Sequence, residues 1–318
     1  MLDLSGQNQN HGGGVDAAAA QFGGAREEWL DLSTGINPVA YPLCVIPSDA
    51  WCALPDRAAQ SGLVSAARAF WRVPDGAAVL AIPGASAAIA MVPLLAQPGR
   101  VHIPSPTYNE HAAAFAAAGW QDATFPQDAQ AQVVVHPNNP DGRLFTAADL
   151  HAPLRIIDES FCDVMPHASL IDQAGVPGTL ILKSFGKFWG LAGLRLGFVI
   201  GDPALVSRLE QMLGPWPVAG PALIIGAQAL RDHNWAESTR IRLAADAARL
   251  DGIAQEAGAK PLGGTTLFKL FEVSDAIEWQ ACLAHYHIWS RVFPNNPRWL
   301  RLGLPSPDKW DRLEAALR

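Results

Sequence analysis

The most specific chemical signal in this sequence is a lysine within the segment SFGKFWG, residues 184–190. Lys187 stands there among three aromatic side chains. An apolar setting lowers the pKa of a lysine, so that a neutral amine can attack a carbonyl carbon. Ser184 precedes Lys187 by three residues and Arg195 follows it by eight, and both residue types can hold a phosphate. An isolated lysine would indicate a solvated surface, but the complete spacing S-x-x-K-x-x-G-x-x-G-x-R-x-G over residues 184–197 is hard to reach by chance.

Three other apolar runs end in side chains that suit a planar, charged ligand. Asp158 follows the run 154–157. A carboxylate at the end of a buried strand needs a partner, and either a cationic ring nitrogen or a surface salt bridge would serve. Asn139 lies in the turn HPNNPDG, residues 136–142, whose prolines and glycine present two asparagine amides at the sheet edge. Tyr108 follows the run 101–103 and would either stack on a planar ligand or pack in the core.

A fourth run is followed by a candidate phosphate site. Ala85 and Ser86 come after the run 79–82 and open an alanine-rich helical segment. The first turn of a helix offers free backbone N–H groups to an anion, although Ser86 could equally be an ordinary helix cap.

Two further patterns indicate alternative chemistries. Gly84-x-Ser86-x-Ala88 nearly matches the G-x-S-x-G motif of serine hydrolases but lacks its last glycine, and His285 or His287 would have to act as the base. Cys282, His285 and His287 are metal-ligand types, but a helix turning into a strand would not aim all three inward, so we expect no metal. A scaffold that has lost its activity is the non-enzymatic alternative.

Short apolar runs alternating with alanine-rich helical segments are the elements that must position these residues. This alternation predicts an α/β fold with a mostly parallel central sheet covered by helices on both faces. In such sheets ligands bind beyond the carboxyl ends of the strands, where the candidate residues stand. The segment MLGPWPVAGPAL, residues 212–223, is rich in proline and breaks the pattern. We therefore expect an N-terminal arm over 1–30, a large domain over 31–218 and a smaller α+β domain over 219–318.

Composition excludes several function classes for this chain of 318 residues. The formal net charge of −7 argues against a basic nucleic-acid-binding or membrane-binding face. The sequence contains no run of 18 apolar residues, so we expect no membrane span. Four cysteines without CxxC pairing and an N-terminus that does not resemble a signal peptide indicate a cytoplasmic protein.

The whole set of motifs, in this order, resembles fold-type I pyridoxal-phosphate enzymes of the histidinol-phosphate aminotransferase branch. The resemblance spans most of the chain, and residues 184–197 are its most specific part. It implies a transferase-like fold of that type, a homodimer and a pyridoxal 5′-phosphate cofactor, with Lys187 forming the Schiff base and Asp158 pairing with the protonated ring nitrogen. The other residues implied to contact the cofactor are Tyr108 on the ring, Asn139 on the 3′-oxygen, and Ala85, Ser86, Ser184 and Arg195 on the phosphate.

Within that branch the chain is most similar to decarboxylating members. The arm HGGG, residues 11–14, and the loop DLSTGINP, residues 31–38, are typical of them, and Phe161 replaces a tyrosine usual in the aminotransferases. The resemblance implies decarboxylation of L-threonine O-3-phosphate to (R)-1-amino-2-propanol O-2-phosphate, a reaction of cobalamin biosynthesis. Transamination of histidinol phosphate or a related amino acid is the alternative, because substrate orientation decides which bond breaks.

The residues implied to bind this phosphorylated amino acid lie near the two ends of the chain. They are His11, Asn37 and Arg291 at the substrate phosphate, Arg301 at the α-carboxylate, and Gly12, which would let the backbone of the arm approach the ligand closely. The sequence departs from the family at Leu54-Pro55-Asp56, where relatives carry a tyrosine that reaches the cofactor phosphate of the neighbouring subunit.

Overall fold

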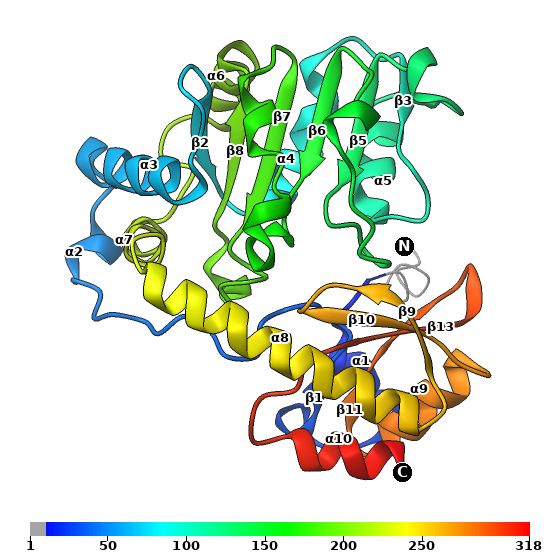
Figure 1. Ribbon diagram of the computed structural model, residues 1–318. Helices are drawn as coiled ribbons and strands as arrows, with labels where there is room; N and C mark the ends of the chain where they lie inside the picture. Colours follow the sequence, from blue (N-terminus) through cyan, green and yellow to red (C-terminus); the bar gives the residue numbers. More distant parts are fainter. Residues whose placement is uncertain (1–10) are drawn as a thin grey trace. The chain divides into compact units, whose positions relative to one another are not determined.

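Strand pairing and helix packing divide the described chain, residues 11–318 of the computed structural model, into two units (Figure 1). Residues 40–239 form the larger unit, whereas residues 11–39 join residues 240–318 in the smaller one. This division differs from the predicted boundaries at 30 and 218. Residues 1–10 of the predicted arm lie outside the described residues.

The arm belongs to the smaller unit because two of its elements pack there. Strand β1 (Leu30–Asp31) pairs in parallel with β11 (Ile288–Trp289). Helix α1 (Val15–Phe22), which falls within the predicted arm, buries Val15 in an apolar cluster with Trp29 and Ala284. The proline-rich segment 212–223 lies inside the larger unit instead, because α7 (Gly220–Ala229) packs against α3 (Arg57–Trp71). The observed boundary falls within α8 (His233–Glu256).

The larger unit contains a seven-stranded sheet with the order β2-β8-β7-β6-β5-β3-β4. Neighbouring strands run parallel except β8, which is antiparallel to both β7 and β2. The strand bounds are β2 Ala78–Ile82, β3 Arg100–His102, β4 Gln121–Asp122, β5 Ala131–Val135, β6 Leu154–Asp158, β7 Thr179–Ser184 and β8 Gly197–Gly201. The predicted mostly parallel sheet is confirmed.

Helices bury this sheet from both sides, which explains why its central strands are mostly apolar. Helices α4 (Ala85–Met91), α5 (Asn109–Ala117) and α6 (Pro203–Leu213) share one apolar cluster with alternate residues of β5, β6 and β7. Toward the opposite face, Trp71 at the end of α3 contacts Phe198 of β8.

The smaller unit is of the predicted α+β type. Its antiparallel sheet has the order β12-β13-β10-β9 and packs with helices α9 and α10. The bounds are β9 Lys260–Gly264, β10 Phe268–Glu272, β12 Arg291–Phe293, β13 Asn296–Gly303, α9 Ala276–His285 and α10 Trp310–Leu317. A short helix in the larger unit, α2, spans Asp49–Cys52.

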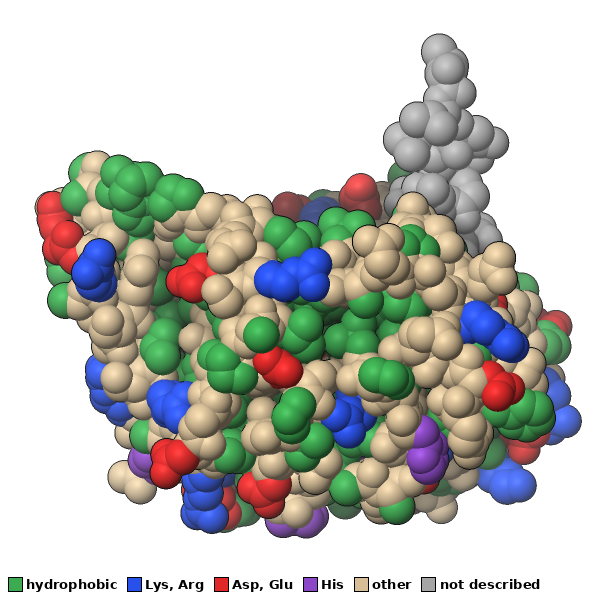
Figure 2. All heavy atoms as spheres, turned by 90° about the horizontal axis from the view of Figure 1, so that it is seen from above, with side chains coloured by type: hydrophobic (Ala, Val, Ile, Leu, Met, Phe, Trp, Pro, Cys, Tyr) green, Lys and Arg blue, Asp and Glu red, His purple; other side chains and the backbone are tan. Residues whose placement is uncertain are grey.

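Charged side chains of both signs are interspersed over the face shown in Figure 2, where no basic patch gathers. Within the described chain, no helix is both long and apolar enough to cross a membrane.

Candidate active site

Asp158 is a buried carboxylate at the carboxyl end of a central strand. It is the last residue of β6 and only 2% exposed. Its Oδ2 lies 2.8 Å from Nε2 of His111, and its Oδ1 accepts hydrogen bonds from the backbone N (3.0 Å) and Oγ (2.5 Å) of Ser160. Burial alone would raise the pKa of Asp158, but the hydrogen bond and charge of His111, together with the bonds from Ser160, lower it. The site therefore holds an ionised carboxylate away from water, and a surface salt bridge does not describe it.

His111 is a site residue that the sequence analysis missed. It lies on α5, is fully buried, and its Nδ1 has no hydrogen-bond partner among the described residues. It follows Tyr108 by three residues, so the two rings share one face of the chain and meet edge to face at 6.2 Å. The one signal for His111 in the sequence is a polar ring three residues after Tyr108 in an alanine-rich segment.

Lys187 lies on the loop after β7 with its amine beside an aromatic ring. Its Nζ is 5.3 Å from the centroid of Phe161, and the side chain is partly exposed. Its chain neighbours Phe185, Phe188 and Trp189 are fully buried.

Tyr108 lies close to Asp158 and to residues predicted to bind the cofactor phosphate. Burial and the charges of Glu110 and Asp158 raise its pKa to about 12, whereas the charge of Arg195 acts in the opposite direction. The phenol is therefore neutral near pH 7. Tyr108 and Ser86 also line the same cavity of about 440 Å³ between α4 and α5. Four predicted site residues therefore lie at one edge of the sheet: Ser86, Tyr108, Asp158 and Arg195.

The start of α4 and the residues before β8 form a cradle. Gly84 has φ +83°, and a Cβ there would lie 2.6 Å from Nη2 of Arg195. A Cβ at Gly197 would lie 2.7 Å from the backbone N of Ala85. Only glycines allow Arg195 and the first amide of α4 to approach this closely. Ser184 ends β7 at the same edge, and its Oγ accepts a hydrogen bond from the backbone N of Gly186.

The predicted asparagine turn has two parts with different roles. Asn138 is fully buried and donates to the carbonyl of Pro106 (2.9 Å) and to Asp141 (2.7 Å), while Thr107 donates to its Oδ1. Asn138 thus holds the loop before Tyr108. Asn139, the predicted cofactor contact, is half-buried in the same turn.

In the smaller unit, two arginines approach the N-terminal arm. Arg291 donates from Nη1 to the carbonyl of His11 (2.8 Å), and Arg301 donates from Nη2 to the carbonyl of Ser33 (2.5 Å). Gly12 packs against Ser33 as well, because a Cβ there would lie 2.5 Å from that carbonyl. Burial and then the charge of Arg291 lower the pKa of Arg301 to about 9, against an opposing effect of Asp31. Two guanidinium groups that repel each other form a site suited to an anion.

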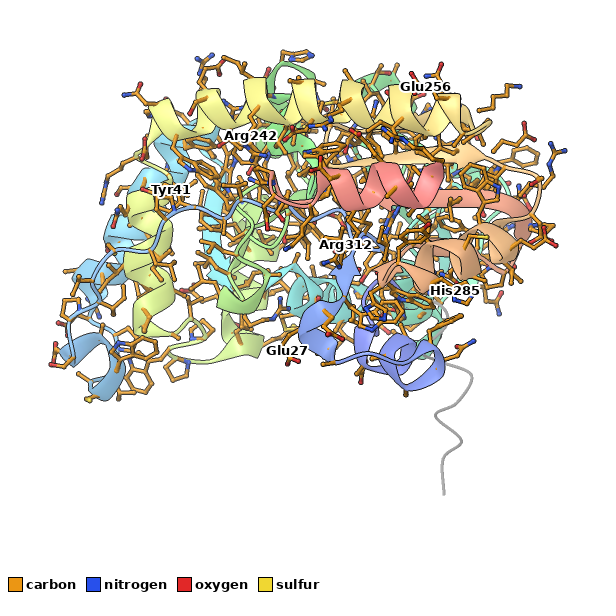
Figure 3. All side chains as sticks on the ribbon, turned by 90° about the horizontal axis from the view of Figure 1, so that it is seen from below. Glu27, Tyr41, Arg242, Glu256, His285 and Arg312 are labelled. Atoms are coloured by element: carbon orange, nitrogen blue, oxygen red, sulfur yellow. The ribbon has the colours of Figure 1, made fainter. Side chains whose placement is uncertain are left out.

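Asn37 is bound differently from the other predicted substrate residues. Its Oδ1 accepts hydrogen bonds from Nη2 of Arg242 (2.6 Å) and from the backbone N of Val39 (3.0 Å). Arg242 lies on α8 (Figure 3). It also pairs with Asp246. The amide oxygen of Asn37 is therefore engaged within the unit, and its NH₂ group is the part suited to an anion.

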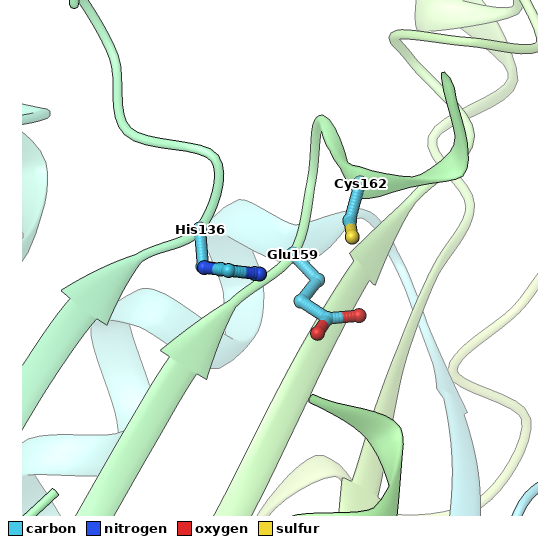
Figure 4. Close-up of side chains that lie close together, drawn as sticks. All are labelled: His136, Glu159 and Cys162. Atoms are coloured by element: carbon cyan, nitrogen blue, oxygen red, sulfur yellow. The ribbon is translucent and has the colours of Figure 1, made fainter. Parts of the chain in front are cut away.

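One cluster of side chains of the kinds that bind metal ions is already engaged in hydrogen bonds within the protein. His136, Glu159 and Cys162 lie close together (Figure 4). Nδ1 of His136 accepts from the backbone N of Phe145 and its Nε2 donates to the carbonyl of Ala168, while both oxygens of Glu159 accept hydrogen bonds. Burial raises the pKa of the Cys162 thiol, which keeps it protonated. These three side chains are a packed network and not an open ligand set.

Comparison with known proteins establishes the family. The family model described as aminotransferase class I and II matches residues 63–317. The chain belongs to this family. A threonine-phosphate decarboxylase of Sinorhizobium sp is 42% identical over 95% of this chain and 95% of its own length. A threonine-phosphate decarboxylase of Pseudomonas aeruginosa is 38% identical over 96% of both.

A solved structure supports the same fold class. The histidinol-phosphate aminotransferase of Sinorhizobium meliloti, in complex with pyridoxal 5′-phosphate, matches with a TM-score of 0.81 over 100% of this chain and 97% of that one, at 17% identity. The fold-type I class expected from the motifs is confirmed. These relatives do not favour the serine-hydrolase alternative.

Proposed function

We propose that this protein uses pyridoxal 5′-phosphate to decarboxylate L-threonine O-3-phosphate to (R)-1-amino-2-propanol O-2-phosphate. The observation that carries the proposal is the similarity, over nearly the full length of the chain, to two threonine-phosphate decarboxylases. The proposal also extends to the place of this reaction in cobalamin biosynthesis and to a cytoplasmic location.

The chemistry of the donor set in the larger unit fits this cofactor. Asp158 supplies an ionised, buried oxygen for a protonated ring nitrogen, and Lys187 supplies the amine for an aldehyde. The cradle of Gly84, Ala85 and Arg195 suits a phosphate, because any larger residue at position 84 would displace the guanidinium group. When bound, the cofactor draws electrons from the α-carbon of the substrate, so that a bond to that carbon can break.

The residues of this chain would decide which bond breaks by holding the two anionic groups of the substrate. We assign the α-carboxylate to Arg301, and the substrate phosphate to Arg291, His11, Gly12 and Asn37. A phosphate and a carboxylate together relieve the repulsion between the two guanidinium groups. Holding both anions would fix the orientation of the substrate and thereby decide which bond to the α-carbon breaks. Lys187 then returns a proton to the α-carbon.

Replacing Arg291 with glutamine is expected to weaken substrate binding without abolishing the chemistry. Loss of one charge-assisted contact should raise KM for threonine phosphate by about 10- to 100-fold, with a smaller change in kcat. Steady-state kinetics on the loaded enzyme measure this. Arg298→Gln is the matched control, because Arg298 is an exposed arginine of the same sheet. Equal KM changes in both variants would contradict the assignment of Arg291.

The experiment that tests the function compares two reactions on the same purified protein. With pyridoxal 5′-phosphate and threonine phosphate, we expect one carbon dioxide and one aminopropanol phosphate per substrate consumed. With histidinol phosphate and 2-oxoglutarate, we expect no glutamate above background. Glutamate formation without carbon dioxide release would identify an aminotransferase and overturn the proposal.

We further propose a homodimer. Four large apolar side chains of the segment 43–54 are more than half exposed: Leu43, Val45, Trp51 and Leu54. Such a run is expected to be covered by another chain. Size-exclusion chromatography with light scattering should give twice the chain mass of 33.9 kDa. Replacing Val45 with aspartate should shift the mass toward one chain, and a wild-type monomer would refute the dimer.

A further inference from the structure

A buried charged network lies beside the site and has no role in the reaction described above. Lys183 of β7 is 1% exposed, and its Nζ lies 2.6 Å from Oε2 of Glu159 and 3.6 Å from Oδ1 of Asp163. Glu159 directly follows Asp158, and Lys183 directly precedes Ser184. The network therefore joins the carboxyl ends of two neighbouring strands that carry site residues. A buried ion pair is weak evidence for stability, so its presence here calls for another reason.

Asp163 extends this network to the loop that carries Lys187. Its Oδ2 accepts a hydrogen bond from the indole Nε1 of Trp189 (3.1 Å), and its Oδ1 accepts one from Nε1 of Trp71 (2.8 Å). Both indoles thus bond the same carboxylate. They differ in position, because Trp189 lies on the loop two residues after Lys187, whereas Trp71 ends α3.

The indole of Trp189 is held by two stacked aromatic rings. It stacks on Phe185 at 5.1 Å and on Trp235 at 5.3 Å, each with an interplanar angle of 12°. Its backbone carbonyl accepts a hydrogen bond from the backbone N of Tyr41 (2.9 Å). Stacking sets the plane of the indole, and the bond to Asp163 fixes its rotation within that plane.

The loop itself is a turn closed by its own backbone hydrogen bonds. The backbone N of Gly190 donates to the carbonyl of Lys187 (3.1 Å), and that of Leu191 donates to the carbonyl of Phe185 (3.2 Å). Because the turn is internally bonded, the orientation of Trp189 sets where the backbone of Lys187 lies. Phe161, whose ring lies under the Lys187 amine, stands two residues before Asp163 in the same segment.

We propose that Asp163, acting through the indole of Trp189, is a positioning residue that holds Lys187 in place relative to Asp158. The inference deepens the proposed function, since it rests on Lys187 being the residue that binds the cofactor aldehyde. Asp163 and Trp189 act through Lys187 and need no contact with substrate.

Two matched variants test this proposal, because each removes one hydrogen bond to the same carboxylate. In the cofactor-free protein, Trp189→Phe should speed hydrogen exchange of the loop peptide 184–191 about tenfold or more, whereas Trp71→Phe should leave that peptide within twofold of wild type. In the loaded enzyme, Trp189→Phe should lower kcat about tenfold with KM within twofold, and Trp71→Phe should change neither. Thermal unfolding should show similar losses for both variants.

Several outcomes would overturn the proposal. Equal loop exchange in the two variants, or unchanged exchange in Trp189→Phe, would show that the indole bond has only a structural role. If Trp189→Phe does not fold, Asp163→Asn replaces it in the exchange experiment. This variant should likewise speed hydrogen exchange of the loop peptide. Faster exchange in Trp189→Phe alone, with no carbon dioxide released by the wild type, would support the positioning role and refute the proposed function.

Discussion

Replacing Lys187 with alanine is expected to lower the rate of carbon dioxide release at least about 1000-fold, the largest effect of any substitution outside the core. The side chain supplies both the amine for the cofactor aldehyde and the proton returned to the α-carbon, so its loss removes two contributions at once. The fold should survive, because Lys187 is partly exposed and the neighbouring aromatic side chains hold the loop. Single-turnover measurements with saturating cofactor give the rate.

Lys309→Ala is the control for this variant. Lys309 is a lysine of the smaller unit that pairs with the exposed Asp308, and its replacement should leave the rate within twofold of wild type. A Lys187→Ala protein that retains more than a tenth of the wild-type rate would contradict the role given to this residue.

Replacing Asp158 with asparagine is expected to lower kcat about 100- to 1000-fold. Asparagine keeps the shape and can still accept hydrogen bonds from Ser160, but it carries no charge to pair with a protonated ring nitrogen. Cofactor affinity should also fall, which titration of the cofactor absorbance measures. A variant with kcat within threefold of wild type would show that the carboxylate charge is not used.

The same variant has a pH signature in the cofactor-free protein. The pKa of Asp158 is lowered in the folded state, so its charge stabilises the fold above the unfolded pKa of about 4, and this contribution is lost as pH falls through the lower folded value. Asp158→Asn should therefore be less stable than wild type at pH 6–7, by about 3 kcal/mol, and the difference should shrink below about pH 4. Urea unfolding at several pH values measures it, and a difference that grows in acid would contradict this account.

The sequence predicts the chemistry of the larger unit well for a physical reason. Buried parallel strands are mostly apolar, so the polar residues that follow an apolar run mark the carboxyl end of a strand. Asp158 and Ser184 are indeed the last residues of β6 and β7. The glycines of the 184–197 motif are also informative, since Gly197 is required by its close approach to Ala85.

Other features need the three-dimensional structure because their signal is not local. His111 pairs with a residue 47 positions later, and its helix is too rich in alanine to show which face is buried. The prolines of 212–223 predict a domain boundary there. The observed boundary falls inside the continuous helix α8, where composition does not change. Strand β1 has two residues, too few for a periodic pattern.

The proposed reaction depends on which lysine binds the cofactor aldehyde, and this can be measured directly. The chain has five lysines. Lys183 is only four residues before Lys187 but is buried in an ion pair, and the three lysines beyond residue 250 lie in the smaller unit, each in an ion pair. Loading the protein with pyridoxal 5′-phosphate, reducing it with sodium borohydride and mapping the peptides by mass spectrometry should find the pyridoxyl group on Lys187 alone. A group on Lys183 or on any other lysine, with Lys187 unmodified, would contradict the assignment on which the proposed reaction rests.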